Sequence, residues 1–263
     1  PPFPARACWK EDLRKIRHIG FNAVKLWAVW SWIESRKGCY YFDDLDEIVS
    51  LCEAEGLKAV INTITEGMPY WLVSEHPDAK YITNEGLPIE MGAPANIPSG
   101  GWPGLCRDKK AVADLCDNFI SAVAGHYADN SAVYAIDVWN EPHIEPAFSY
   151  PDKLFCYCGH SIENFRKWLE KKYHNITNLN KVWFRAYNSW NEVLPSLRFT
   201  TYPDMMDWRL FWLDNLSNWL EARANAARRA APDKYIITHV PFSGYINNCE
   251  NPETGLGIYL GDE

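Results

Sequence analysis

The chain has 263 residues, of which 47% are hydrophobic, and its formal net charge at pH 7 is −8. No block of lysine and arginine is present, which argues against nucleic acid and anionic membranes as partners. No apolar stretch reaches the roughly 20 residues that a membrane span needs. The start, PPFPARACWK, lacks the basic region and apolar stretch of a secretion signal, so we expect a cytoplasmic protein.

Strands and helices alternate along the chain. Hydrophobic spacing predicts helices at 11–19, 44–55, 109–127, 161–173 and 204–231, and strands at 21–30, 58–65, 133–141 and 235–240. An irregular segment lies at 66–107, and a loop this long in a compact domain is usually functional. This alternation predicts an α/β fold with a parallel sheet covered by helices on both sides. An open sheet and a barrel both satisfy it.

The apolar strand at 133–139 ends in Asn140, Glu141 and Pro142. Pro142 disfavours helical geometry at the residue before it, so we expect the chain to stay extended through Glu141. The carboxylate would then lie at the rim of the strand, where parallel barrels carry catalytic groups. Partial desolvation would raise its pKa, which suits a general acid near neutrality. We therefore favour catalysis over a turn without chemistry.

Two further residues are candidates for contact with a ligand. Glu66 follows the strand at 58–65 and either lines a cleft or lies in water as the start of a loop. Trp30 is one of several tryptophans at strand ends or in the long loop, where an aromatic face suits a sugar ring. For each of these tryptophans the core is the commoner location.

Five consecutive blocks resemble family 42 of the retaining (β/α)8 glycoside hydrolases. They are GFNAVKLWAVWSWIES, YYFDDLDEIVSLCEAEGLKAVINT, PYWLVSEHPDA, FCYCGHSIENFRKWLEKKY and LNKVWFRAYNSWNEV. The strand-terminal WNEP is typical of the wider clan. The resemblance implies a (β/α)8 TIM barrel of which this chain holds about strands 2–5. Residues 1–263 would then be one partial catalytic domain, truncated at both ends.

The resemblance also implies an activity and a set of site residues. A β-galactosidase of this family hydrolyses terminal non-reducing β-D-galactosides by double displacement between two carboxylates. Glu141 would be the acid/base, Asn140 would bind the sugar, and Lys25 stands where members carry a substrate-binding arginine. No residue of the chain matches the family's nucleophile. Alternatives are a clan member acting on β-glucan or mannan, and a catalytically inactive sugar-binding barrel.

Cysteines provide a candidate metal site. Cys106, Cys156 and Cys158 resemble the structural zinc cluster of many family members, but Ser161 takes one cysteine position, and the neighbouring His160 could replace it. Structural zinc normally has four strong ligands, so we favour a relic site in which Ser161 caps the next helix. The three cysteines should converge in either case. We expect no cofactor for catalysis, an oligosaccharide or β-galactoside as substrate and, by resemblance, a homotrimer.

Overall fold

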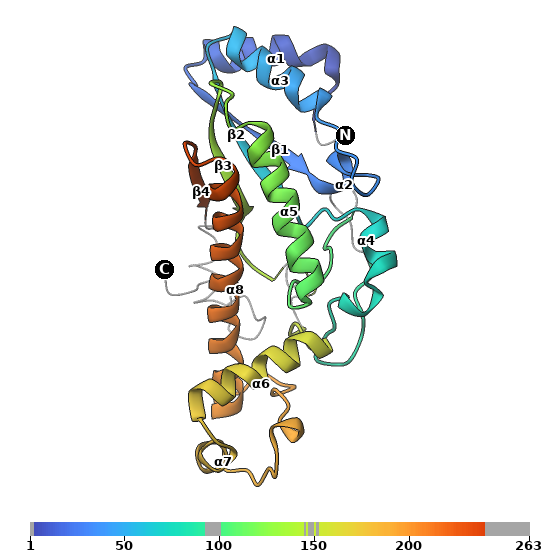
Figure 1. The fold of residues 1–263 in the computed structure, drawn as a ribbon, viewed down its shortest axis with the longest axis vertical. Coiled ribbons are helices and arrows are strands. Elements are labelled where there is room, and N and C mark those ends of the chain that lie inside the picture. Colours follow the sequence, from blue (N-terminus) through green and yellow to red (C-terminus); the bar gives the residue numbers. More distant parts are fainter. Residues whose placement is uncertain (1–2, 93–100, 145, 147–149, 151–152, 240–263) are drawn as a thin grey trace.

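The computed structural model describes residues 3–92, 101–144, 146, 150 and 153–239 (Figure 1). Most elements lie within a few residues of the predicted ranges. In chain order they are α1 (Trp9–His18), β1 (Ala23–Val29), α2 (Trp30–Ile33), α3 (Asp43–Ala54), β2 (Lys58–Ile64), α4 (Tyr70–Glu75), α5 (Lys110–His126), β3 (Val133–Asn140), α6 (Gly159–Tyr173), α7 (Ile176–Trp183), α8 (Pro203–Ala230) and β4 (Tyr235–His239).

The sheet has four parallel strands in the order β1-β2-β3-β4, so each strand pairs with the next one in the chain. One row across it runs from Trp27 to Asn62 to Asp137. Open doubly wound sheets reverse their strand order at a switch point, whereas a barrel keeps it sequential. The observed order therefore favours an arc of a barrel over an open sheet.

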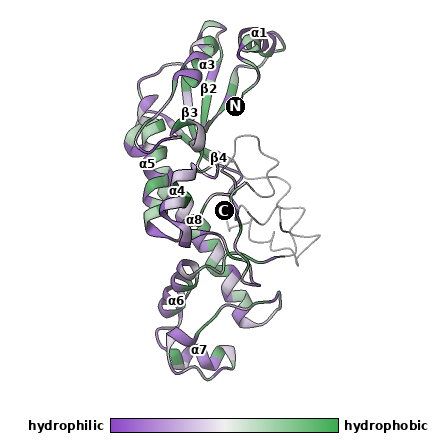
Figure 2. Ribbon diagram, turned by 90° about the vertical axis from the view of Figure 1, so that its right-hand side faces the viewer, coloured by the Kyte–Doolittle hydropathy of each residue, from purple (hydrophilic) through white to green (hydrophobic). Residues whose placement is uncertain are grey.

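The two faces of this arc differ in chemistry. Leu26, Ile61 and Ile136 alternate with the polar residues and join one core with apolar residues of α1, α3, α5 and α8. Figure 1 shows α5 and α8 side by side along the sheet, and Figure 2 shows the hydrophobic residues of β2 in green. Asn62 and Asp137 face the other way, although both are almost fully buried. The prediction of helices on both sides of the sheet is therefore wrong for the part of the chain that the structure describes. In a barrel the helices lie only on the outer face of the sheet.

A second core lies around the N-terminal half of α8. Trp208 and Trp212 are fully buried there, and they pack with Phe165 of α6 and Leu179 of α7. The sequence did not indicate α7. Helix α8 enters both cores and thereby connects α6 and α7 to the sheet, which Figure 1 shows. No helix in the described part of the chain has the length and apolar character for crossing a membrane.

Candidate active site at the end of β3

A β-bulge lies at the end of β3. Asp137 pairs with Ile237 and Asn140 with His239, so three steps on β3 match two on β4. Side chains alternate along a regular strand, which would put Asp137 and Asn140 on opposite faces. The extra residue instead puts them on the same face. Lys25 of β1 confirms this, because its Nζ lies 2.7 Å from Asp137 Oδ2 and 3.2 Å from Asn140 Oδ1.

Helix α8 covers the back of the bulge. Arg223 lies over the Trp139 ring, with its guanidinium carbon 3.9 Å from the ring centroid. Its Nη1 donates to the Val138 carbonyl at 3.3 Å, and its Nη2 donates to Glu66 Oε1 at 2.5 Å. Burial lowers the pKa of Arg223, and the adjacent Glu66 carboxylate opposes this. Arg223 was not among the residues predicted from the sequence, although an arginine among the apolar residues of a tryptophan-rich helix is a signal of a buried partner.

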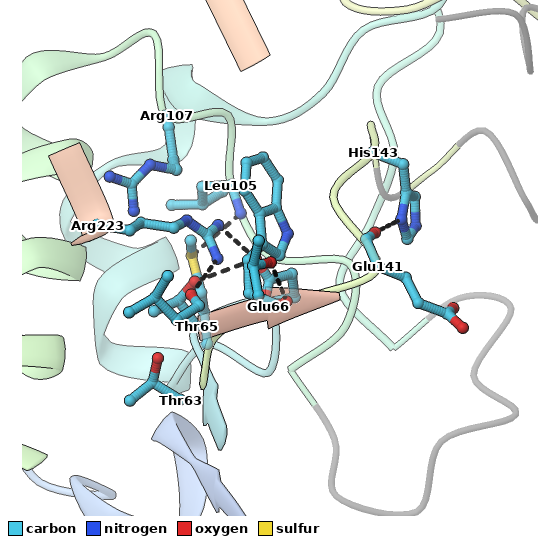
Figure 3. Close-up of polar contacts among 12 residues, drawn as sticks. Thr63, Thr65, Glu66, Leu105, Arg107, Glu141, His143 and Arg223 are labelled. Atoms are coloured by element: carbon cyan, nitrogen blue, oxygen red, sulfur yellow. Dashed lines mark hydrogen bonds and ion pairs between the residues drawn. The ribbon is translucent and has the colours of Figure 1, made fainter. Parts of the chain in front are cut away.

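Glu66 is part of this buried cluster. Only 5% of the residue is exposed, and Oε1 accepts a second hydrogen bond from Thr65 Oγ1 at 3.1 Å (Figure 3). The alternative of a loop carboxylate in water is therefore wrong. Its role as a sugar contact stays a prediction, and the ion pair with Arg223 restricts it, because Oε1 already has two donors.

Glu141 directly follows the last residue of β3. Its φ is 53°, in the left-handed region, so the expectation of an extended chain through Glu141 is wrong. Pro142 does exclude a right-handed helix there, and the chain turns instead. Residues held in such sparsely populated regions cluster at functional sites. The Glu141 carbonyl accepts from His143 Nδ1, and the half-buried carboxylate points away from the Glu66–Arg223 pair (Figure 3).

Trp30 lies in the core and not at the rim. It is 1% exposed, and its ring stacks on Phe119 of α5 with centroids 5.3 Å apart. Its Nε1 donates to Glu34 Oε2 at 2.7 Å. The candidate contact of Trp30 with a sugar is therefore wrong and the alternative of a core tryptophan holds, because the strand ends at Val29 and the first turn of α2 directs the indole toward α5.

The three candidate metal-binding cysteines converge as expected. The sulfur atoms of Cys106, Cys156 and Cys158 all lie within 4.8 Å of one another and are buried. Ser161 Oγ lies 3.3 Å from both Cys106 Sγ and Cys158 Sγ. The N-cap of α6 is Cys158, whose sulfur accepts from Ser161 N, so the expectation that Ser161 caps this helix is wrong.

His160 does not join this cluster. Its Nε2 lies 3.1 Å from Asp78 Oδ2, and the one group among the described residues with the geometry to hold a metal ion contains only the three cysteines. This corrects the expectation that His160 could supply a fourth ligand. The fourth place belongs to the Ser161 hydroxyl, which is a weak zinc ligand beside thiolate and imidazole. The residues present therefore do not fit a closed tetrahedral zinc site.

Comparison with known proteins shows the family. The family model of glycoside hydrolase family 42, described as β-galactosidase, matches residues 3–254. A β-galactosidase of Thermus thermophilus is 29% identical over 251 residues, which cover 92% of this chain and 36% of that protein. The chain thus spans about a third of the length of the curated relatives it matches.

Solved structures agree on the fold. The β-galactosidase of the psychrophilic Marinomonas ef1 superposes with a TM-score of 0.75 at 24% identity, over 90% of this chain and 35% of that one. The catalytic domain of a β-amylase from Paenibacillus polymyxa gives a TM-score of 0.78 at 16% identity, over 100% of this chain and 70% of that one. At these identities the likeness shows the fold alone. The four-stranded sheet is an arc of a (β/α)8 barrel.

Proposed function

The chain belongs to glycoside hydrolase family 42, the β-galactosidases, and on this premise we propose that the protein hydrolyses terminal non-reducing β-D-galactosides with retention of configuration. Glu141 is the general acid/base and Asn140 binds the sugar beside it. The observation that carries this proposal is the position of Glu141, directly after β3 inside the matched region, with its carboxylate directed away from the buried ion pair. Residues 1–263 form part of one catalytic domain.

The proposed mechanism needs a second carboxylate. Retaining glycosidases place two carboxyl groups about 5–5.5 Å apart, one as acid/base and one as nucleophile. Glu66 and Asp137 are both almost fully buried, at 5% and 1% exposure, so neither carboxylate is open to attack a sugar. We therefore assign the nucleophile to a part of the protein outside this chain, as the resemblance implies. Proton transfer between carboxyl groups and water requires no cofactor, and we propose no tightly held zinc.

The substrate class and the assembly are the finer parts of the proposal. A glycoside is the substrate that the family supports. Aryl β-galactosides, β-glucan and mannan offered side by side separate a galactosidase from the alternative glycanases. A protein that binds galactose but turns over none of them would support the inactive sugar-binding barrel. The homotrimer and the cytoplasmic location stay predictions, which light scattering and cell fractionation would test.

The role of Glu141 is tested by its dependence on the leaving group. In the full-length protein, Glu141→Ala should lower kcat/KM by about 10²–10⁴-fold for aryl β-galactosides with poor leaving groups, which need protonation. Dinitrophenyl galactoside, which needs none, should lose far less in the galactosylation step. Glu163→Ala, an exposed glutamate on α6, is the matched control and should be silent. Equal losses for all leaving groups would remove Glu141 from acid catalysis.

A further inference from the structure

The side chain of Lys25 connects two groups on β3. It extends from β1 across the polar face of the sheet, and its side chain is 32% exposed. Its ammonium forms an ion pair with Asp137, whose side chain is 2% exposed, and donates to the Asn140 amide. Both contacts depend on the bulge, because only the extra residue puts Asp137 and Asn140 on the same face.

The chemistry of the ammonium fixes the orientation of the amide. Lysine carries three donors and no acceptor, so the atom of Asn140 that faces Nζ must be the oxygen. The amide nitrogen of Asn140 then points the other way with its two N–H donors. A charge-assisted bond to the buried Asp137 holds the ammonium in place, and such bonds are shorter and stronger than neutral ones.

We propose that Lys25 is a positioning residue that acts through Asn140. Asp137, Lys25 and the bulge fix the Asn140 amide so that it donates to a hydroxyl of the sugar next to Glu141. Lys25 therefore need not contact the substrate itself, in contrast to the direct contact implied by the family resemblance. This inference rests on the proposed function and adds to it the reason for the orientation of Asn140.

A mutant cycle in the full-length protein tests the proposal. Lys25→Met should lower kcat/KM by about tenfold, the usual size of one lost hydrogen bond to a charged group. Asn140→Ala should cost at least as much. Because Lys25 acts through Asn140, the double variant should be no worse than Asn140→Ala alone. Lys25→Arg keeps a charged donor and should recover part of the loss.

A series of monodeoxygalactosides provides a readout that a merely structural role would not change. Each deoxy substrate is compared with the parent galactoside in wild type and in Asn140→Ala. The hydroxyl bound by Asn140 is the one whose removal lowers kcat/KM much more in wild type than in this variant. In Lys25→Met, removal of this same hydroxyl should lower kcat/KM as little as it does in Asn140→Ala. Removal of any other hydroxyl should lower kcat/KM as much as it does in wild type. Additive effects in the double variant, or unchanged selectivity in Lys25→Met, would overturn the proposal. The same four proteins can also be compared by their affinities for galactose and its deoxy analogues, which requires no turnover.

Two controls keep the outcomes distinct. Lys25→Met leaves Asp137 buried without this partner, so Lys25→Met/Asp137→Asn, which removes that charge, provides the cycle if the single variant does not fold. Glu141→Ala separates the two proposals. Retention of full activity there contradicts the proposed function, whereas a normal dependence on Glu141 with additive Lys25 and Asn140 effects contradicts only the positioning role.

Discussion

Arg223 stabilises the back of the site through three contacts made by one guanidinium. It forms a buried ion pair with Glu66, donates to the Val138 carbonyl at the bulge, and stacks on Trp139. Both charges of the pair are almost fully buried, at 2% and 5% of the side-chain surface. The removal of one partner leaves the other charge buried without its ion-pair partner, which costs far more than the pair contributes.

Arg223→Met should therefore destabilise the protein by about 3–5 kcal/mol, seen as a lower midpoint of thermal unfolding. Arg223→Met/Glu66→Met should recover part of this loss, because both charges of the pair are then removed. Arg228→Met, an exposed position on the same helix, is the control and should change stability by about 0.5 kcal/mol at most. A midpoint for Arg223→Met equal to that of the control would show that the pair does not support the fold.

The sequence predicted the site residues whose positions depend on neighbours in the chain, and it did not predict those whose positions depend on distant partners. Asn140 and Glu141 were predictable because their position at a strand end depends only on neighbouring residues. Arg223 was not, since its partner Glu66 lies 157 residues away in the chain. For Trp30 the sequence left a sugar contact and a core location open, because a strand-end position does not say whether the ring turns inward or toward a helix. The left-handed φ of Glu141 has no signature in the sequence.

The start of α6 and two loops meet at the cysteine cluster. Cys158 caps α6, Cys106 lies shortly before α5, and Cys156 accepts from the Ile82 amide at 3.4 Å. The cluster therefore connects three segments of the chain through hydrogen bonds that involve sulfur. Burial raises the pKa of Cys106 and Cys156, whereas hydrogen bonds from these two thiols lower the pKa of Cys158.

Ser161→Cys should turn this cluster into a zinc site. Its Oγ already lies 3.3 Å from two of the three sulfur atoms, so a fourth thiolate there completes a tetrahedral set. By elemental analysis we expect about one zinc per chain in the variant and little zinc in wild type. By thermal melts we expect the variant to have a higher midpoint of unfolding than wild type. Ser161→Cys/Cys106→Ser, again with three thiols, should lose the gain. Tightly held stoichiometric zinc in wild type would contradict this account.

Element boundaries were largely predictable, since the hydrophobic period survives in helices and strands that face a core. The cap of α6 was not, because serine is a common cap and cysteine is not. The cap depends on where the Cys158 sulfur points, and the neighbouring sulfur atoms determine that. Helix α7 was missed because it is only eight residues long, with an apolar set too short to show a period.

At the scale of the whole molecule, strand order decided between two architectures. Alternating strands and helices fit an open sheet and a barrel equally, and only the order β1-β2-β3-β4 favours the barrel arc. This arc directs Asn140 and Glu141 to its carboxyl edge, where barrel enzymes hold their active sites. The chain spans about a third of the length of its curated relatives.

The product that Glu141→Ala forms with azide tests the central claim most directly. Without the acid/base, a small anionic nucleophile can attack the galactosyl-enzyme intermediate in place of water. The account predicts that azide accelerates turnover of dinitrophenyl galactoside by the full-length variant and that proton NMR identifies β-galactosyl azide as the product. An α-galactosyl azide would contradict retention. Undiminished hydrolysis without azide would show that Glu141 is not the acid/base.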